Sequence, residues 1–217
     1  METESVCKCF GKHPSKKLQE VFSQKPYQIQ KPEKAKIIFL GLDANFDKDI
    51  EKDECFFNET LKYLKDGVEY WKSNKDFHTP MLNPKCNYKG DGIKYHRNFR
   101  KLYFTSKKED DICFMELLKC CTYGSSGTNR KLFMEMVKAP ENKEHLCRIK
   151  KLAEMGKKIC ISKSVSRIIN QLKLFDVSGE NIIIHRHLSW ISNKELKALG
   201  KELHEFLAKS TTGGHYE

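Results

Sequence analysis

The strongest constraint on the fold is a run of four apolar residues closed by a glycine, in the stretch KIIFLGLDANF at 36–46. A strand from Ile37 to Leu40 would carry apolar side chains on both faces, which is typical of a buried parallel sheet. We expect this strand at about 36–42. Asp43 then follows its carboxyl end, where open α/β sheets form their binding crevices. Aspartate at such a position is also common as a turn or helix cap, so position alone leaves both roles open.

Similar apolar runs and amphipathic segments alternate along the rest of the chain. Three further strands are expected, at about Ile112–Leu118, 157–162 and 181–185. Segments with a helical apolar period are expected at 58–71, near 93–104, within 130–155, at 164–175 and from 192 onward. Alternating strands and helices indicate a mostly parallel sheet with helices on both faces. The predicted fold class is therefore α/β, a three-layer α/β/α sandwich with a central, mostly parallel four-stranded sheet.

Capping residues predict where two of these helices begin. Asn58 is a favourable cap for the helix that carries Leu61 and Trp71 on its apolar face. Ser192 and Glu195 form a capping box at the start of the last helix.

Length and composition bound the domain organisation. A chain of 217 residues with 39% apolar residues is long enough for one well-buried core. Residues 1–35 are polar and contain three prolines, so we predict an N-terminal arm with at most one short helix. The predicted α/β domain covers 36–209, and 210–217 form a flexible tail. Within the domain, 77–92 is a long connection rich in Pro, Gly and Asn, and such loops are typically functional or disordered.

The sequence also indicates a cellular location. No run approaches the ~18 apolar residues that a membrane span requires, and the amino terminus lacks the apolar core of a secretory signal. We therefore expect a cytoplasmic protein, nuclear if the source is eukaryotic, that is monomeric and binds no membrane. Nine cysteines in such a compartment are expected to be free thiols or metal ligands rather than disulfides.

An excess of basic residues points to a class of partner. The formal net charge is +11, and the segment Lys143–Lys173 contains nine basic residues against two acidic ones. A second cluster, at 95–101, mixes basic and aromatic residues. Such surfaces neutralise the phosphates of nucleic acids, but they also occur as solvated helix faces.

Three polar side chains close or follow different predicted strands. Asp43 follows the first strand, Glu116 lies near the end of the second, and His187 follows the fourth. Because the carboxyl ends of parallel strands meet at one edge of a sheet, two carboxylates and an imidazole can converge on one crevice. Simpler interpretations also stand: Glu116 as a partner of a helix terminus or an arginine, and His187 as a core histidine bonded to the backbone.

Four short motifs, in order across about 36–190, resemble the uracil-DNA glycosylase superfamily. GLDANF follows the first strand as that family's water-holding motif does, and FMELLKCCTYG resembles its base-reading strand. HLSW after the fourth strand is similar to its His-Pro-Ser motif. TPMLNP, followed by GIKYHRNFRKL, is placed like the segment that carries a base-stacking aromatic residue.

The resemblance implies a DNA glycosylase that hydrolyses the N-glycosidic bond of a damaged or modified base flipped out of DNA. Asp43 would stabilise the sugar cation and align water, and His187, or the nearby His185, would stabilise the departing base. The remaining implied roles are base binding by Gly41, Leu42, Asn45, Phe46, Met81 and Glu116, and DNA binding by Lys163, Arg167 and Ser189. The alternative is a catalytically inert nucleic-acid-binding module of the same fold. A Rossmann-like nucleotide enzyme is disfavoured, because neither G-x-G-x-x-G nor a P-loop follows the first strand.

Several positions depart from the family's pattern. Ala44 and Asn45 stand where the family commonly has Pro and then Tyr or Gly. Leu188 replaces the Pro of the His motif, and Met81 occupies the stacking position. Glu116 replaces the base-reading Asn, and an ionised carboxylate only accepts hydrogen bonds. Uracil presents both an acceptor and a donor, so an amine-bearing modified base is expected to suit Glu116 better than uracil. The target base stays open between the two.

No dissociable cofactor and no catalytic metal are expected. Some members of the superfamily hold an iron–sulfur cluster, and the residues that fall in comparable places here are Cys7, Cys9, Cys120 and Cys147. The first pair is spaced C-x-C rather than C-x-x-C, and 26 residues separate the last two. This spacing disfavours a cluster.

Overall fold

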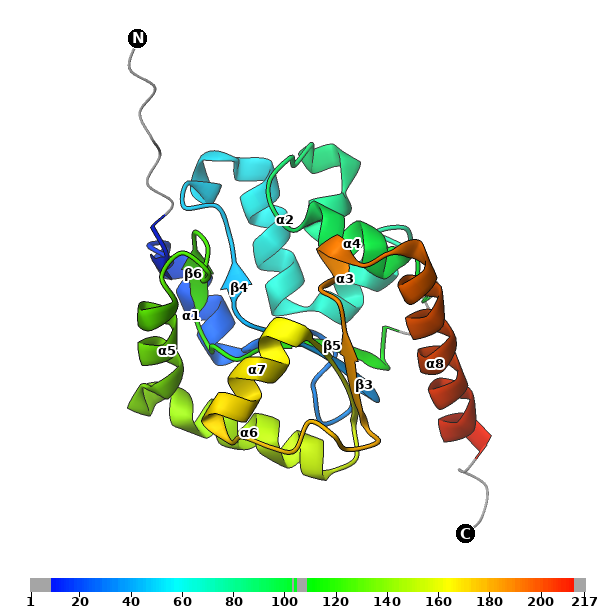
Figure 1. The fold of residues 1–217 in the computed structure, drawn as a ribbon. Helices are drawn as coiled ribbons and strands as arrows, with labels where there is room; N and C mark the ends of the chain where they lie inside the picture. The colour runs from blue at the N-terminus through cyan, green and yellow to red at the C-terminus, as the bar shows by residue number, and fades with distance from the viewer. Residues whose placement is uncertain (1–8, 103, 105–108, 213–217) are drawn as a thin grey trace.

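The centre of the protein is a five-stranded, mostly parallel sheet, seen in a computed structural model that describes residues 9–102, 104 and 109–212 (Figure 1). The four predicted strands are confirmed as its parallel part: β3 (Ile37–Gly41), β5 (Ile112–Glu116), β7 (Lys158–Ser162) and β8 (Ile182–His185). A further strand, β2 (Tyr27–Ile29), pairs antiparallel with β5 at one edge. The order is β2-β5-β3-β7-β8, so the predicted count of four strands is one too low.

Helices cover both faces of the sheet, as an α/β/α arrangement requires. Ile37 and Phe39 of β3 belong to the core on one face, and Ile38 and Leu40 to the core on the other. The helices of the first face are α1 (Lys16–Gln24), α2 (Glu54–Lys65), α3 (Gly67–Ser73), α4 (Ile93–Arg100) and α8 (Asn193–Thr212). Those of the second face are α5 (Arg130–Lys138), α6 (Lys143–Glu154) and α7 (Lys163–Leu172). Figure 1 shows α8 on the side of the sheet away from α6 and α7.

Within the predicted arm over 1–35, residues 9–35 are part of the fold, which corrects that prediction for the described residues. Ser15 caps α1 by accepting a hydrogen bond from the Leu18 amide, and both Leu18 and Phe22 are fully buried. β2 then extends the central sheet. Each of these elements has so few apolar residues that no sustained period is visible in the sequence. Residues 1–8 lie outside the described part of the chain.

Residues 54–73 form two helices rather than the single helix predicted to begin at Asn58. Asp53 caps α2 by accepting a hydrogen bond from the Phe56 amide, so Asn58 lies inside that helix. Asp66 ends α2 and caps α3, where it accepts from an amide of the first turn. An aspartate at each start satisfies amide groups that have no partner within the helix.

The last helix begins as predicted. Ser192 Oγ accepts a hydrogen bond from the Glu195 amide, and Glu195 Oε2 accepts one from the Ser192 amide. α8 continues to Thr212, so the predicted tail at 210–217 begins inside this helix, and 213–217 lie outside the described residues. Neither α8 nor any other described helix is long and apolar enough to cross a membrane.

A second, small sheet that the sequence does not reveal holds the segment after β3. Its strands are β1 (Gly11–Lys12), β6 (Cys121–Tyr123) and β4 (Ala44–Asn45). Two or three residues are too few for a recognisable pattern. β4 pairs parallel with β6 and places Asn45 beside Thr122. Gly124 follows with a φ of 72°, and a Cβ there would collide with the Cys9 carbonyl group, so this turn requires glycine.

Candidate active site

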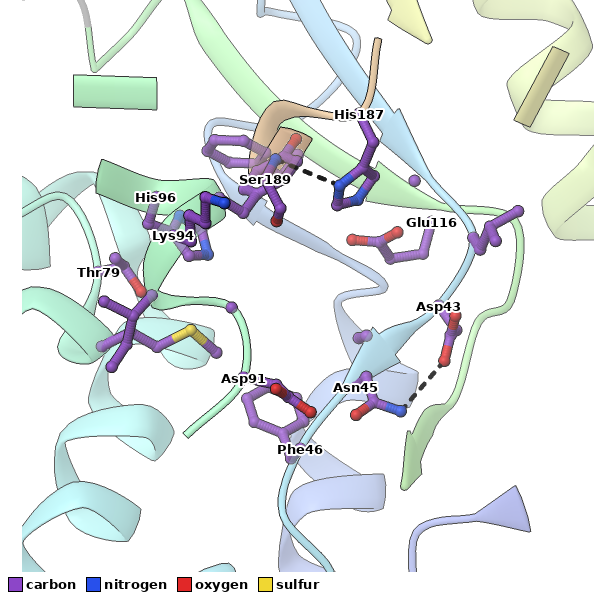
Figure 2. A pocket seen from close by; sticks show the side chains of 18 of the residues that line it. Asp43, Asn45, Phe46, Thr79, Asp91, Lys94, His96, Glu116, His187 and Ser189 are labelled. Atoms are coloured by element: carbon purple, nitrogen blue, oxygen red, sulfur yellow. Dashed lines mark hydrogen bonds between the residues drawn. The ribbon is translucent and has the colours of Figure 1, made fainter. Parts of the chain in front are cut away.

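A cavity of about 990 Å³ opens at the carboxyl edge of the central sheet. Asp43, Glu116 and His187 all line it, although they follow or end three different strands, β3, β5 and β8. Figure 2 shows the three side chains around the same space. The structure therefore brings together the three polar residues that the sequence places at strand ends.

The Asp43 carboxyl group is held by three hydrogen-bond donors. Thr122 Oγ1 donates to its Oδ2 at 2.5 Å, and Asn45 Nδ2 donates to the same oxygen at 3.4 Å. Ser126 donates a third hydrogen bond. Burial raises the pKa of Asp43, and the three donors oppose that change because they stabilise the charged form. Asp43 is therefore a fixed carboxyl group on the cavity wall rather than a solvated turn residue.

The Glu116 carboxyl group faces the cavity and has no hydrogen-bond partner among the described residues. No hydrogen-bond donor from the described part of the chain reaches either of its oxygens. A Cβ at Gly41 would meet Glu116 Oε2, so any larger residue at position 41 would displace this carboxyl group. Burial raises the pKa of Glu116 well above its usual range, and the charge of Asp43 raises it further.

The two carboxyl groups are therefore driven to different protonation states. Both are penalised by burial, but Asp43 accepts three hydrogen bonds and Glu116 accepts none from the described residues. Two like charges in one cavity also repel each other, so the first proton to bind goes to the group without donors. Glu116 holds that proton, and Asp43 keeps the negative charge.

Two histidines at the end of β8 differ in which ring nitrogen carries the proton. The Ser189 amide donates to His187 Nδ1 at 3.3 Å, so the proton of the neutral ring is on Nε2. His185 Nδ1 instead donates to the Arg186 carbonyl oxygen at 2.7 Å, which leaves its Nε2 as an acceptor. Burial lowers the pKa of both rings and favours their neutral forms. Of the two, His187 is the ring with a donor left for the cavity.

The other residues predicted to contact a base line the same cavity: Gly41, Leu42, Asn45, Phe46 and Met81. Asn45 uses its amide nitrogen within the protein, donating to Asp43 and to the Gly124 carbonyl group. This arrangement makes Asn45 a support for Asp43. Phe46 and Met81 instead present apolar surface to the cavity.

The residues predicted to contact DNA lie at and beside the cavity. Ser189 lines it, whereas Lys163 and Arg167 are exposed on α7 outside its wall. Ser162, which caps α7, and Ser164 also line the cavity, with their hydroxyl oxygens 2.8 Å apart. The amino end of α7 therefore faces the cavity, and the partial positive charge of a helix start favours anions there.

Two aromatic features of the cavity are absent from the sequence-based prediction. Phe56 and Tyr88 line one wall and stack, with ring centroids 4.0 Å apart and planes 11° apart. Trp190 lies on the rim and is 68% exposed, with Lys94 Nζ 4.4 Å from its ring centroid. The sequence indicates the Phe56–Tyr88 stack only through the long connection at 77–92, which contains Tyr88. Trp190 is the last residue of the HLSW motif.

Three of the four candidate iron–sulfur cysteines lie in the described part of the chain. Among the described residues, Cys9, Cys120 and Cys147 belong to no group of three or more potential metal ligands, and Cys7 lies outside the described part of the chain. Burial also raises the pKa of the Cys120 thiol, which opposes the thiolate form that a metal requires.

Comparisons with known proteins give no further assignment. No protein-family model matches the chain, and searches of curated proteins and of solved structures found no match. Function must therefore be inferred from the chemistry of the cavity.

Glu116→Gln should stabilise the protein relative to the parent as the pH rises. Because the pKa of Glu116 is raised by folding, the folded chain holds a proton that the unfolded chain releases above about pH 4.5. The parent's free energy of unfolding should therefore fall between that pH and the raised pKa, by up to about 1.4 kcal/mol per pH unit. Glutamine carries no such proton. The free energy of unfolding of the variant, measured by urea unfolding from about pH 5 to about pH 8, should therefore fall less steeply with pH than that of the parent.

The matched control is Glu135→Gln, which removes an exposed carboxyl group from α5. The free energy of unfolding of this variant should change with pH as that of the parent does. Equal slopes in the parent and in Glu116→Gln would instead show that Glu116 titrates in the folded state as it does in the unfolded chain.

Proposed function

We propose that the protein is a DNA glycosylase, which hydrolyses the N-glycosidic bond of a damaged or modified base flipped out of DNA. The observation that carries this proposal is the presence in one cavity of a hydrogen-bonded Asp43 carboxylate and a His187 ring with its proton on Nε2. Breaking an N-glycosidic bond leaves positive charge on the sugar and negative charge on the base. A catalyst needs a fixed anion for the first and a fixed donor for the second. The cavity contains both.

Asp43 supplies the negative charge. Its donors Thr122 and Asn45 fix its position before the substrate arrives, so little reorganisation is needed during the reaction. In this role the carboxylate stabilises the sugar cation and accepts a hydrogen bond from the attacking water. The water oxygen bonds to the anomeric carbon and gives one proton to Asp43, and the base leaves with the electron pair of the broken bond. The base anion then takes up a proton, which restores the Asp43 carboxylate.

His187 supplies the hydrogen bond to the departing base. Partial burial lowers its pKa and so favours the neutral ring, and the bond from the Ser189 amide leaves the Nε2 hydrogen free. Donation from Nε2 stabilises the negative charge that develops on the base as the bond breaks. His185 is unsuited to this task because its remaining nitrogen is an acceptor.

Glu116 reads an edge of the flipped base. A protonated carboxyl group has a donor and an acceptor, the same pair that an amide offers. The raised pKa of Glu116 thus changes the expectation drawn from an ionised glutamate. When protonated, Glu116 can pair with uracil at O4 and N3. Once ionised it only accepts, and an amine-bearing base then fits better.

The rim of the cavity supports DNA as the partner. Lys94 lines the cavity, Lys163 is exposed between the lining residues Ser162 and Ser164, and the chain as a whole carries a net charge of +11. Such charges neutralise phosphates and release counterions. The exposed ring of Trp190 is suited to stack on bases or to fill the gap that a flipped nucleotide leaves in the duplex.

Asp43→Asn should slow base release by about two to three decades, the equivalent of ~3–4 kcal/mol of charge stabilisation. DNA binding should be nearly unchanged, because the substitution preserves the shape of the side chain. The measurement is single-turnover base release from duplex oligonucleotides that each carry uracil or another modified base, read by alkaline cleavage at abasic sites.

Asp49→Asn is the matched control, since Asp49 is exposed and pairs with Lys52. Its rate should equal that of the parent. Unchanged release by Asp43→Asn would leave Asp43 a purely structural residue. Binding of DNA without release of any base by the parent would favour the inert nucleic-acid-binding module.

DNA affinity should fall steeply with salt, because the basic surface must release counterions from the phosphates. Replacing Lys163 and Arg167 with Gln should reduce the slope of log affinity against log salt concentration by about 1 for each lost phosphate contact. Lys150 and Lys151 lie on the last turns of α6, which precedes the start of β7 at the edge of the sheet opposite the cavity. Replacing these two lysines with Gln changes the charge by the same amount and provides the control. A slope near zero in the parent would exclude nucleic acid as the partner.

Uracil excision should depend on pH differently in the parent and in Glu116→Gln. Glutamine keeps a donor and an acceptor at every pH, whereas an ionised Glu116 faces uracil O4 with a lone pair, a mismatch worth about 1–3 kcal/mol. Uracil excision by the parent, relative to the variant, should fall about tenfold or more as the pH rises through the raised pKa. The measurement is the rate of excision of uracil and of amine-bearing bases by the parent and by Glu116→Gln across this pH range. A ratio independent of pH would remove Glu116 from base recognition.

A further inference from the structure

Two cysteine thiols are in contact behind one wall of the cavity. Cys55 is exposed in the first turn of α2, and Cys86 is buried at the end of a 3-10 turn, η3 (Pro84–Cys86). Their sulfur atoms are 3.4 Å apart, and Cys55 Sγ also lies 3.6 Å from the Lys85 carbonyl oxygen. Neither thiol has a role in the proposed glycosylase chemistry.

The thiol pair is linked directly to residues that line the cavity. Phe56 follows Cys55, and Tyr88 lies two residues after Cys86. These two rings form the stacked wall described above, with centroids 4.0 Å apart. A covalent bond between the two cysteines would hold the start of α2 against the 83–92 connection and so fix this wall.

We propose that Cys55 and Cys86 are a redox-controlled modification site, at which exchange with a small-molecule disulfide forms a reversible Cys55–Cys86 disulfide. The inference is independent of the proposed glycosylase activity. A disulfide has sulfur atoms about 2.05 Å apart, so the existing contact must shorten by roughly 1.4 Å. The bond joins a helix start to a short turn, and no strand of the central sheet has to move.

The different environments of the two thiols set the order of events. Cys55 is exposed and, as a thiolate, attacks one sulfur of the small-molecule disulfide, which forms a mixed disulfide and releases one thiol. Burial raises the pKa of Cys86 to about 12, so Cys86 reacts second and gives up its proton as it attacks. Its sulfur bonds to Cys55 Sγ and displaces the second small thiol. Two protein thiols are oxidised, and one disulfide is reduced to two thiols.

The test is to incubate the folded protein with oxidised glutathione and to map its disulfides by mass spectrometry of proteolytic peptides. We expect a cross-linked peptide that contains Cys55 and Cys86, lighter than the two reduced peptides by two hydrogen atoms, and its loss on adding dithiothreitol. Amide hydrogen exchange across 83–92 should be about tenfold slower, or more, in the oxidised protein, because the cross-link restricts local opening.

Two variants separate the steps, and a third provides the control. Cys55→Ser, at an exposed position, should abolish the cross-link, whereas Cys86→Ala should retain the mixed disulfide with glutathione on Cys55. Cys113→Ser removes another buried thiol, on β5, and should leave the Cys55–Cys86 cross-link unchanged. The proposal is overturned if the parent retains the mixed disulfide on Cys55 or pairs Cys55 with a different cysteine. Unchanged hydrogen exchange in the cross-linked protein would overturn the effect on the cavity wall.

Discussion

The central strand β3 is buried on both faces, and the positions of the other elements depend on it. Ile37 and Phe39 enter one core, while the intervening Ile38 enters the other. Burying such a side chain contributes about 1.5–3 kcal/mol, and a shift of the strand by one residue would exchange its two faces. β3 therefore has one register between β5 and β7. That register places Asp43 two residues beyond the strand, at the carboxyl edge where the cavity opens.

The small sheet brings hydrogen-bond donors to the Asp43 carboxyl group. β4 carries the chain away from Asp43 alongside β6, and the pairing brings Thr122 within hydrogen-bonding distance of the carboxylate. Glu116, at the end of the neighbouring strand β5, has no donor from the described residues. The two-residue pairing of β4 with β6 therefore gives donors to one carboxyl group of the cavity and none to the other. As a result, Asp43 is charged and Glu116 is neutral. Both roles proposed for them depend on this separation.

The long, periodic elements could be predicted from the sequence, and the short ones could not. The four parallel strands and the last helix have enough apolar or capping residues to be recognised, and the strand-end positions of Asp43, Glu116 and His187 follow from them. β1, β2, β4 and β6 contain two or three residues each and exist through tertiary pairing. The sequence does not reveal Thr122 as a donor to Asp43, because this contact depends on the register of β4 on β6. The prediction of a helix start at Asn58 is wrong because Asp53, five residues earlier, is an equally good cap and is the one that the helix uses.

The protonation pattern of the histidines depends on backbone geometry that residue types do not encode. His187 precedes a 3-10 turn, η5 (Leu188–Trp190), and this turn directs the Ser189 amide onto its Nδ1. The glycosylase motif that HLSW resembles has Pro at the position of Leu188, but the donor to the ring is the Ser189 amide, so this difference removes no hydrogen bond from the ring. Leu188 is fully buried, and its carbonyl oxygen accepts from Asn98 Nδ2 of α4 at 2.6 Å. Leucine packing and this hydrogen bond hold the turn where proline would have stiffened it. The departure at 188 is thus compatible with a His187 that donates from Nε2.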